Sequence, residues 1–143
     1  MMDHFYFFLR LIICFILSFM IGLEREIRGS GAGLRTNIIV CLGAFLFVSA
    51  SFNSYDDDIM RIPAQVVCGI GFLGAGAFAI DSNKTKGLNT AATIWGVAAI
   101  GVLVGLKLIF EALLGTIAII FTNVFIRKIK KTIAPDRYFE DDL

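Results

Sequence analysis

Charge is scarce in this chain of 143 residues: 17% are Asp, Glu, Lys or Arg, whereas 57% are hydrophobic. Soluble domains carry roughly a quarter charged residues, and a chain of this length cannot bury so much apolar surface in one core. The low polarity and the 14 phenylalanines also exclude a disordered segment. We therefore expect the chain to lie in a lipid bilayer.

A strong excess of positive charge, a catalytic histidine and paired cysteines are also missing. The net charge of +1 excludes a polybasic nucleic-acid binder, so no nucleic acid is expected as a partner. The single histidine, His4, lies near the start of the chain, so no nucleophile–histidine–acid set is available and no enzyme is expected. The three cysteines have no metal-ligand spacing, and we interpret them as small apolar helix residues.

Long apolar runs are what the sequence has in abundance. A membrane-spanning helix needs roughly 20 mostly apolar residues. Five runs approach or reach this length: 5–23, 37–52 (extended if 34–36 join it), 63–80, 88–106 and 108–126. We predict an all-α membrane protein with five transmembrane helices in residues 1–126, followed by a short tail, 127–143.

The distribution of lysine and arginine over the short loops predicts the orientation. Ten of these residues lie between the first and second runs, between the third and fourth runs, or after the fifth run. Only Arg61 and Lys107 lie in the loops on the opposite side. Since cytoplasmic loops carry the excess of basic residues, we predict that the N-terminus is outside and the C-terminus is cytoplasmic.

Small residues are concentrated in the third and fourth runs. Residues 69–74 match the G-x-G-x-x-G dinucleotide fingerprint, but the match lies inside an apolar run, and Ile94 stands where an acidic residue is required. We interpret the glycines as packing positions that let two helices approach closely, within one subunit or across an oligomer, with a dimer favoured. An ion site built from glycine carbonyls is the alternative. The packing candidates are Gly69, Gly71, Gly74, Ala75, Gly76, Gly96, Gly101 and Gly105.

Charged and polar side chains gather at the predicted cytoplasmic boundary. Glu24 and Arg28 stand four residues apart, in the order that favours a helical ion pair. A glycine-rich turn at 29–33 follows. An arginine so close to lipid needs a hydrogen-bond or ion-pair partner, because an unpaired charge there is costly. We predict a functional cluster, with ordinary interface anchors as the alternative. Its candidates are Glu24, Arg25, Glu26, Arg35, Thr36, Asn89 and Thr90.

Three further acidic or basic features lie toward the predicted outer side. The run Asp56, Asp57 and Asp58 could attract Mg²⁺, which prefers oxygen ligands, although a solvated acidic loop is the commoner explanation. No other cofactor is expected. Arg10 and Glu111 could pair with each other, or each could extend to the membrane surface.

Several of these segments together resemble the MgtC/SapB family of bacterial inner-membrane proteins. The resemblance rests on Gly22-Leu-Glu-Arg-Glu26 with Ala32-Gly-Leu-Arg-Thr36, on Arg61-Ile-Pro-Ala-Gln65 running into the glycines of 69–76, and on Gly87-Leu-Asn-Thr-Ala-Ala92. It covers nearly all of residues 5–126. It implies five spans, a cytoplasmic C-terminus and a multi-pass location in the bacterial inner membrane.

The resemblance also implies a function. Family members are linked to adaptation to magnesium limitation and, in pathogens, to virulence. It implies that the chain regulates a membrane partner such as the membrane sector of the F-type ATP synthase. A transporter or channel for Mg²⁺ or another cation is the alternative, and an oligomeric scaffold is a third hypothesis. Virulence-type members continue into a cytoplasmic domain of ACT-like fold, and because this chain stops at Leu143 we expect that domain to be absent.

Overall fold

The structure, a computed structural model, describes residues 2–52, 60–79, 87–126 and 129. These residues form helices and no strands, which confirms the prediction of an all-α chain. The helices are α1 (Met2–Ile27), α2 (Leu34–Ser51), α3 (Arg61–Ala79), α4 (Leu88–Gly105) and α5 (Ile109–Phe121), which continues into a π-helical turn, η1 (Thr122–Ile126).

Four of these helices are long and apolar enough to cross a membrane: α1, α2, α4 and α5 together with η1. An 18-residue helix such as α2 is about 27 Å long, close to the roughly 30 Å of a hydrocarbon core. The remaining helix, α3, is apolar over Arg61–Ala77, which is shorter. The five predicted apolar runs therefore coincide with five helices, four of which qualify as candidate spans.

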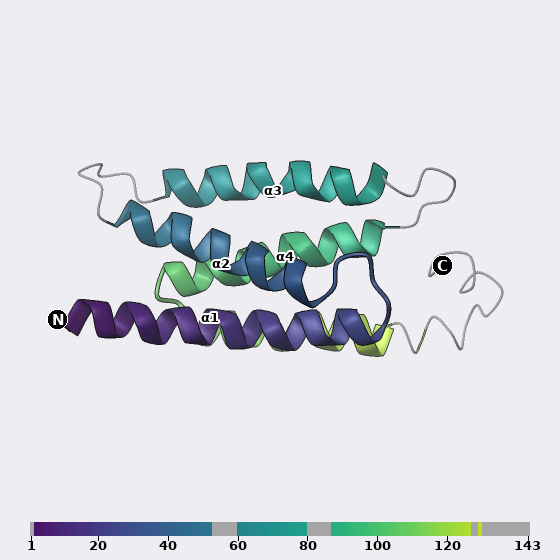
Figure 1. The fold of residues 1–143 in the computed structure, drawn as a ribbon, viewed down its shortest axis with the longest axis horizontal. Helices are drawn as coiled ribbons and strands as arrows, with labels where there is room; N and C mark the ends of the chain where they lie inside the picture. The colour runs from purple at the N-terminus through teal and green to yellow at the C-terminus, as the bar shows by residue number, and fades with distance from the viewer. Residues whose placement is uncertain (1, 53–59, 80–86, 127–128, 130–143) are drawn as a thin grey trace.

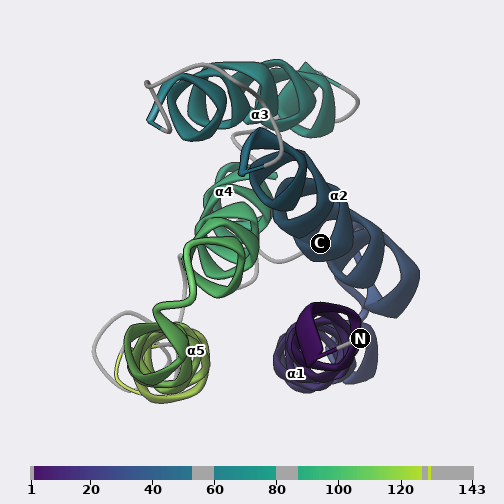
Figure 2. The ribbon, with the colours of Figure 1, turned by 90° about the vertical axis from the view of Figure 1, so that its left-hand side faces the viewer.

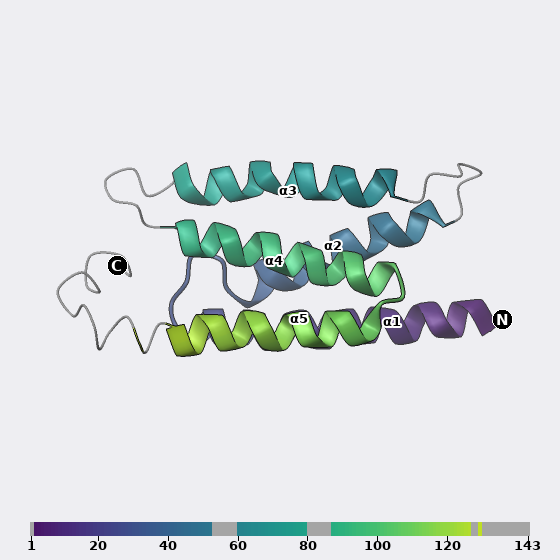
Figure 3. The same ribbon diagram turned by 180° about the vertical axis from the view of Figure 1, so that it is seen from behind.

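The helices lie side by side and each reverses the direction of the one before it (Figure 1; Figure 3). Seen along the bundle, α2 and α4 form a middle layer, with α3 on one side and α1 and α5 on the other (Figure 2). The turn at 28–33, the start of α4 and the end of η1 all lie at one end of the bundle, which we call the turn end (Figure 3). The N-terminus lies at the opposite end (Figure 1).

The tightest packing in the bundle is between α2 and α4. Gly101 and Gly105 permit this approach because neither has a side chain. A Cβ atom added at Gly105 would lie 2.7 Å from the Val48 Cβ, and one added at Gly101 would collide with the Cys41 carbonyl oxygen. Phe45 and Val97 are fully buried in the same core. Two of the predicted packing glycines of α4 thus pack against α2, whereas the sequence led us to expect α3.

The small residues of α3 behave differently from this expectation. The helix does contact α4, and a Cβ at Gly74 would meet the Ala91 Cβ at an ordinary 3.6 Å. Among the described residues, however, nothing lies within 4 Å of a Cβ added at Gly69, Gly71 or Gly76, and Ala75 is exposed. These positions do not hold α3 within the chain because they point away from its neighbours. Their use across an oligomer stays a prediction.

Two helix ends are closed by the same turn. After α1, Gly29 has φ +67°, and the amides of Gly29 and Ser30 donate to the carbonyls of Glu26 and Arg25 at 3.0 and 3.1 Å, respectively. Such a left-handed residue after a helix closes the last turn and usually must be glycine. At the end of α4 the same position is taken by Lys107, with φ +68°, and the Leu108 amide donates to the Leu103 carbonyl at 2.9 Å.

Arg10 is held at the end of α4. Its Nη1 donates to the Gly105 carbonyl at 3.2 Å, and the guanidinium lies 5.9 Å from the centre of the Phe45 ring. The Gly105 carbonyl lies in the last turn of α4, where carbonyls lack partners within the helix. Of the two alternatives that the sequence left open for Arg10 and Glu111, the pairing is therefore wrong: Arg10 binds a helix end, and Glu111 is exposed.

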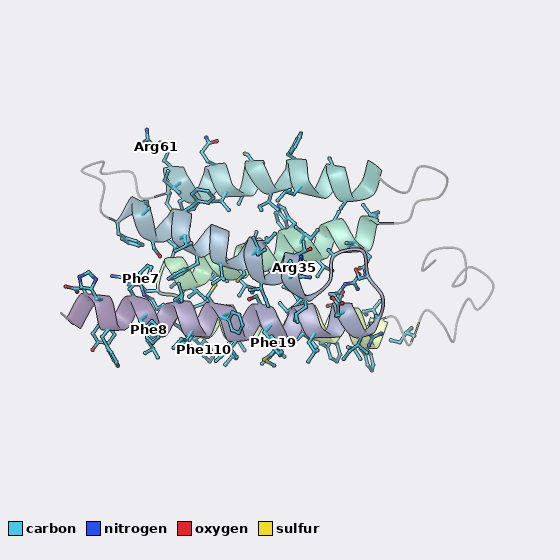
Figure 4. All side chains as sticks on the ribbon, in the orientation of Figure 1. Phe7, Phe8, Phe19, Arg35, Arg61 and Phe110 are labelled. Carbon is cyan, nitrogen blue, oxygen red and sulfur yellow. The ribbon has the colours of Figure 1, made fainter. Side chains whose placement is uncertain are left out.

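The outer surface of the bundle is strongly apolar. Phe8, Phe19 and Phe110 are among its exposed side chains, on α1 and α5 (Figure 4). Soluble monomers rarely expose contiguous apolar patches of more than a few hundred Å². Such a surface suits contact with the acyl chains of lipids, in agreement with the apolar composition of the chain.

Cys14 and Cys41 provide a chemical test of the α1–α2 packing. Both are buried free thiols, and their sulfur atoms lie 3.1 Å apart, whereas Cys68 on α3 is exposed. We expect diamide, which accepts two electrons and two protons, to join Cys14 to Cys41. Intact-mass measurement after denaturation and alkylation should then show one reactive thiol in place of three. The Cys14→Ser variant should keep its two remaining thiols; intramolecular loss of both would contradict the arrangement.

Candidate functional site

A buried arginine ties three segments together at the turn end. Arg25 is in the last turn of α1 and only 6% exposed. Its Nη2 donates to the Ser30 hydroxyl at 2.8 Å, in the turn at 28–33, and to the Thr90 hydroxyl of α4 at 3.3 Å. The two hydroxyls lie 3.1 Å apart and are hydrogen-bonded to each other. We call Arg25, Ser30 and Thr90 the arginine clasp.

Next to the clasp, Glu24 and Arg28 form the ion pair that their spacing predicted. Arg28 Nε contacts Glu24 Oε1, one turn back along α1. The Glu24 side chain is 11% exposed, and both of its carboxylate oxygens are buried. Among the described residues, Glu24 Oε2 has no hydrogen-bond donor. A buried carboxylate oxygen of this kind can still accept a hydrogen bond or bind a cation.

Glu26 has a different role, at the start of α2. Its Oε2 accepts a hydrogen bond from the Leu34 amide at 2.8 Å, so it caps an amide that the helix leaves unpaired. Gly33 makes room for this carboxylate, because a Cβ at Gly33 would collide with Glu26 Oε2. Asn37 of α2 is fully buried and also holds this turn. Its side-chain amide donates to the carbonyls of Ala32 at 2.9 Å and Gly33 at 2.7 Å.

This cap leads to a prediction for Glu26 and Gly33. Glu26→Ala should lower the free energy of unfolding by about 1 kcal/mol, because the Leu34 amide loses its acceptor. Gly33→Ala should cost a similar amount, because the new methyl group displaces the carboxylate. Since both changes remove the same hydrogen bond, the double variant should cost less than their sum. Thermal unfolding followed by circular dichroism in detergent measures this; additive losses would contradict the shared cap. Gly31→Ala is the control, because no atom of the described residues lies within 4 Å of its added Cβ.

The structure brings together only part of the predicted cluster. Arg25 and Thr90 are bonded directly, and Glu24 and Glu26 lie beside them in α1. Arg35, Thr36 and Asn89 are exposed at the same end of the bundle, and Figure 4 labels Arg35 beside the turn. The predicted Mg²⁺ candidates Asp56, Asp57 and Asp58 lie outside the described residues. Within the described ranges, no group of three or more His, Cys, Asp or Glu side chains is arranged to hold a metal ion.

A family comparison now identifies the kind of chain that carries this arrangement. The model of the MgtC family matches residues 11–132, which include α1 from Leu11 onward, all of α2 to α5 and the whole clasp. The chain belongs to the MgtC family. This confirms the resemblance seen in the sequence motifs.

Curated relatives agree with this family assignment. The chain is 46% identical over 120 residues to "Protein MgtC" of Salmonella typhimurium, covering 84% of this chain and 52% of the relative. It is 48% identical over 114 residues to "Protein MgtC" of Brucella abortus, covering 79% and 48%. A Synechocystis protein, slr0014, is 47% identical over 120 residues, covering 83% and 51%. The chain thus spans about half the length of these relatives. No solved structure matches it.

Three polar residues of this MgtC-family chain escaped the sequence prediction of the site. Ser30 lies in a glycine-rich turn, where serine is common, so nothing in the pattern links it to α4. Asn37 and Asn123 do carry a signal, because each is an amide inside an otherwise apolar run. Polar side chains in membrane helices tend to face the protein interior. Both are in fact buried, Asn37 completely and Asn123 with 9% exposure.

Proposed function

We propose that this MgtC-family chain is a non-enzymatic, multi-pass inner-membrane protein that supports adaptation to magnesium limitation by regulating a membrane partner. The membrane sector of the F-type ATP synthase is the partner we propose. The turn end faces the cytoplasm in this proposal, with the N-terminus outside and all five helices crossing the bilayer. Membership of the MgtC family and the names of the relatives support the proposed link to magnesium limitation.

The observation that carries the proposal is the internal use of the boundary charges. Arg25 is bound to Ser30 and Thr90, Glu26 caps α2, and Glu24 pairs with Arg28. These contacts hold α1, the turn and α4 in one geometry. A surface that recognises a partner needs such a fixed scaffold, because ordering flexible side chains on binding reduces affinity.

The exposed polar side chains around this scaffold are the proposed contact surface. Arg35 and Thr36 lie at the start of α2, and Asn89 lies at the start of α4. Arginine is enriched among the residues that dominate interface energies. The surface would therefore present one guanidinium and two small polar groups to the partner at the membrane boundary.

The test is capture of the ATP synthase membrane sector from native membranes after mild crosslinking. We expect the wild-type chain to retain it and Arg35→Glu to lose at least about ten-fold of the signal, because the charge at the contact is reversed. Arg61→Glu is the control, which should retain the signal. It makes the same charge reversal on an exposed arginine at the opposite end of the bundle (Figure 4). Equal capture by wild type and Arg35→Glu would contradict the proposed surface.

A cation transporter or channel is the second candidate, and Glu24 favours it. Its buried Oε2 has no hydrogen-bond partner among the described residues, and Mg²⁺ and Ca²⁺ bind carboxylate oxygens. Flux of Mg²⁺ into proteoliposomes with a trapped indicator distinguishes the two functions. Regulation predicts the same signal as empty vesicles at every gradient and membrane potential. Flux that depends on Glu24, and is lost in Glu24→Gln, would replace regulation by transport.

A further inference from the structure

A pocket of about 250 Å³ opens between α4 and the end of α5. Ala92, Ala118 and Ile119 form its apolar wall. Its polar lining comes from Asn89 and Thr93 of α4 and from Thr122 and Asn123 of η1. The start of α4 and the end of η1 both lie at the turn end (Figure 3), so the pocket lies near that end of the bundle. It is separate from the arginine clasp, which joins α4 to α1 and not to α5.

The unpaired side-chain amide of Asn123 is the feature of this pocket that points to a ligand. The residue is 9% exposed, and its Nδ2 is buried without a hydrogen-bond partner among the described residues. Leaving a buried amide donor unpaired is costly, so a bound acceptor would stabilise the structure. The nearby Thr93 hydroxyl donates to the Asn89 carbonyl at 2.8 Å, and no hydrogen bond joins it to Asn123 Nδ2. Asn123 also lies in a π-helical turn, a distortion often found at functional sites.

We propose that this pocket binds one diacyl phospholipid, with an ester carbonyl oxygen accepting the hydrogen bond from Asn123 Nδ2. The free donor requires an acceptor, and the alanine and isoleucine wall suits the first methylene groups of an acyl chain. The pocket is smaller than the roughly 300–1,000 Å³ of sites that enclose a whole small molecule. It therefore fits part of a larger amphiphile whose remainder stays in the bilayer.

The position of the pocket agrees with this occupant. Glycerol esters lie at the boundary between hydrocarbon and headgroups, and the turn end carries Arg25, Arg28 and Arg35, which mark that boundary. A water molecule would satisfy Asn123 as well, since Asn89, Thr93 and Thr122 also line the pocket. A comparison of ester and ether lipids distinguishes the two occupants.

The experiment is native mass spectrometry of the detergent-purified chain titrated with a phosphatidylethanolamine. The probes are the diester lipid and its diether analogue with the same chains, which lacks the ester carbonyls. We expect the wild type to bind the diester about five-fold more tightly than the diether, the value of one ordinary hydrogen bond. Asn123→Leu should remove this preference. Gln65→Leu, an exposed amide on α3, should keep it.

Ala118→Phe provides a second variant in case Asn123→Leu fails to fold. Ala118 is exposed and lines the pocket, so a phenyl ring there should fill it and weaken binding of both lipids without disturbing the core. Equal affinity of the wild type for the diester and diether lipids would overturn the proposal, because the ester carbonyl would then not be the acceptor of the Asn123 hydrogen bond. A preference that survives in both variants would overturn it too.

Discussion

Gly101→Ala is expected to cause the largest loss of stability in this protein. The added methyl group would collide with the carbonyl oxygen of Cys41 and lie 2.9 Å from the Ala44 Cβ. Both obstacles belong to the fully packed middle of α2, and a backbone carbonyl cannot move aside as a flexible side chain can. The helices must therefore separate. Because overpacking a core costs about 1–3 kcal/mol even when side chains yield, we expect a loss of at least roughly 3 kcal/mol.

Gly43→Ala is the matched control for this prediction. Gly43 lies in α2 close to the same crossing, but nothing lies within 4 Å of its added Cβ among the described residues. Replacing such a glycine by alanine favours the helix, so stability should rise by about 0.5 to 1 kcal/mol. Unfolding of each variant in mixed detergent micelles, followed by circular dichroism, gives both values. If Gly101→Ala were as stable as Gly43→Ala, the described α2–α4 packing would be wrong.

These two glycines show how far the sequence could predict the packing. The positions of all five helices followed from the apolar runs, because segments in lipid must satisfy their backbone hydrogen bonds internally. The glycines of α4 were visible as well. The sequence could not show which helix they face, since small-residue spacing defines a stripe without naming its partner. The α2–α4 contact depends on the rotation of α4, which packing of the whole bundle determines.

The helix ends, too, were predictable from the sequence only in part. Gly29, in the glycine-rich turn that the sequence suggested, has positive φ, and so has Gly87, which lies between the third and fourth apolar runs. Lys107 ends α4 in the same left-handed conformation, and no sequence rule would choose lysine for it. Its conformation follows from the tertiary structure around the α4–α5 connection, in which Lys107 Nζ lies 5.2 Å from the centre of the Phe52 ring.

The candidate site was predictable only where its contacts are local. Glu24 and Arg28 are four residues apart, so helix geometry alone predicts their pairing. The bond between Arg25 and Thr90 crosses 65 residues, and the sequence indicated only that both lie at the same membrane boundary. The cap that Glu26 provides for Leu34 depends on the path of the turn, which the glycines leave open. The charge pattern thus predicted that these side chains share one end of the bundle, but not the bonds between them.

Arg25→Met tests whether the arginine clasp holds the functional geometry. Methionine keeps an apolar stem of similar reach but removes the donors to Ser30 and Thr90. Hydrogen bonds from a charged group contribute roughly 1.5–3 kcal/mol, so we expect a loss of about 2 kcal/mol. Under the proposed function we also expect loss of growth at low magnesium, because α1 and α4 are no longer joined beneath the proposed partner surface.

Arg35→Met separates the clasp from the general effect of removing a boundary arginine. Arg35 is exposed, so its stability should change by no more than about 0.5 kcal/mol, whereas partner capture should fall. Thr90→Val should reproduce part of the Arg25→Met loss, and the two changes together should cost less than their sum, because they remove a shared bond. Full stability of Arg25→Met, or additive losses with Thr90→Val, would show that the α1–α4 connection does not depend on this arginine. The proposed partner surface would then have to be held by the Glu26 cap and Asn37, which fix only the turn to α2.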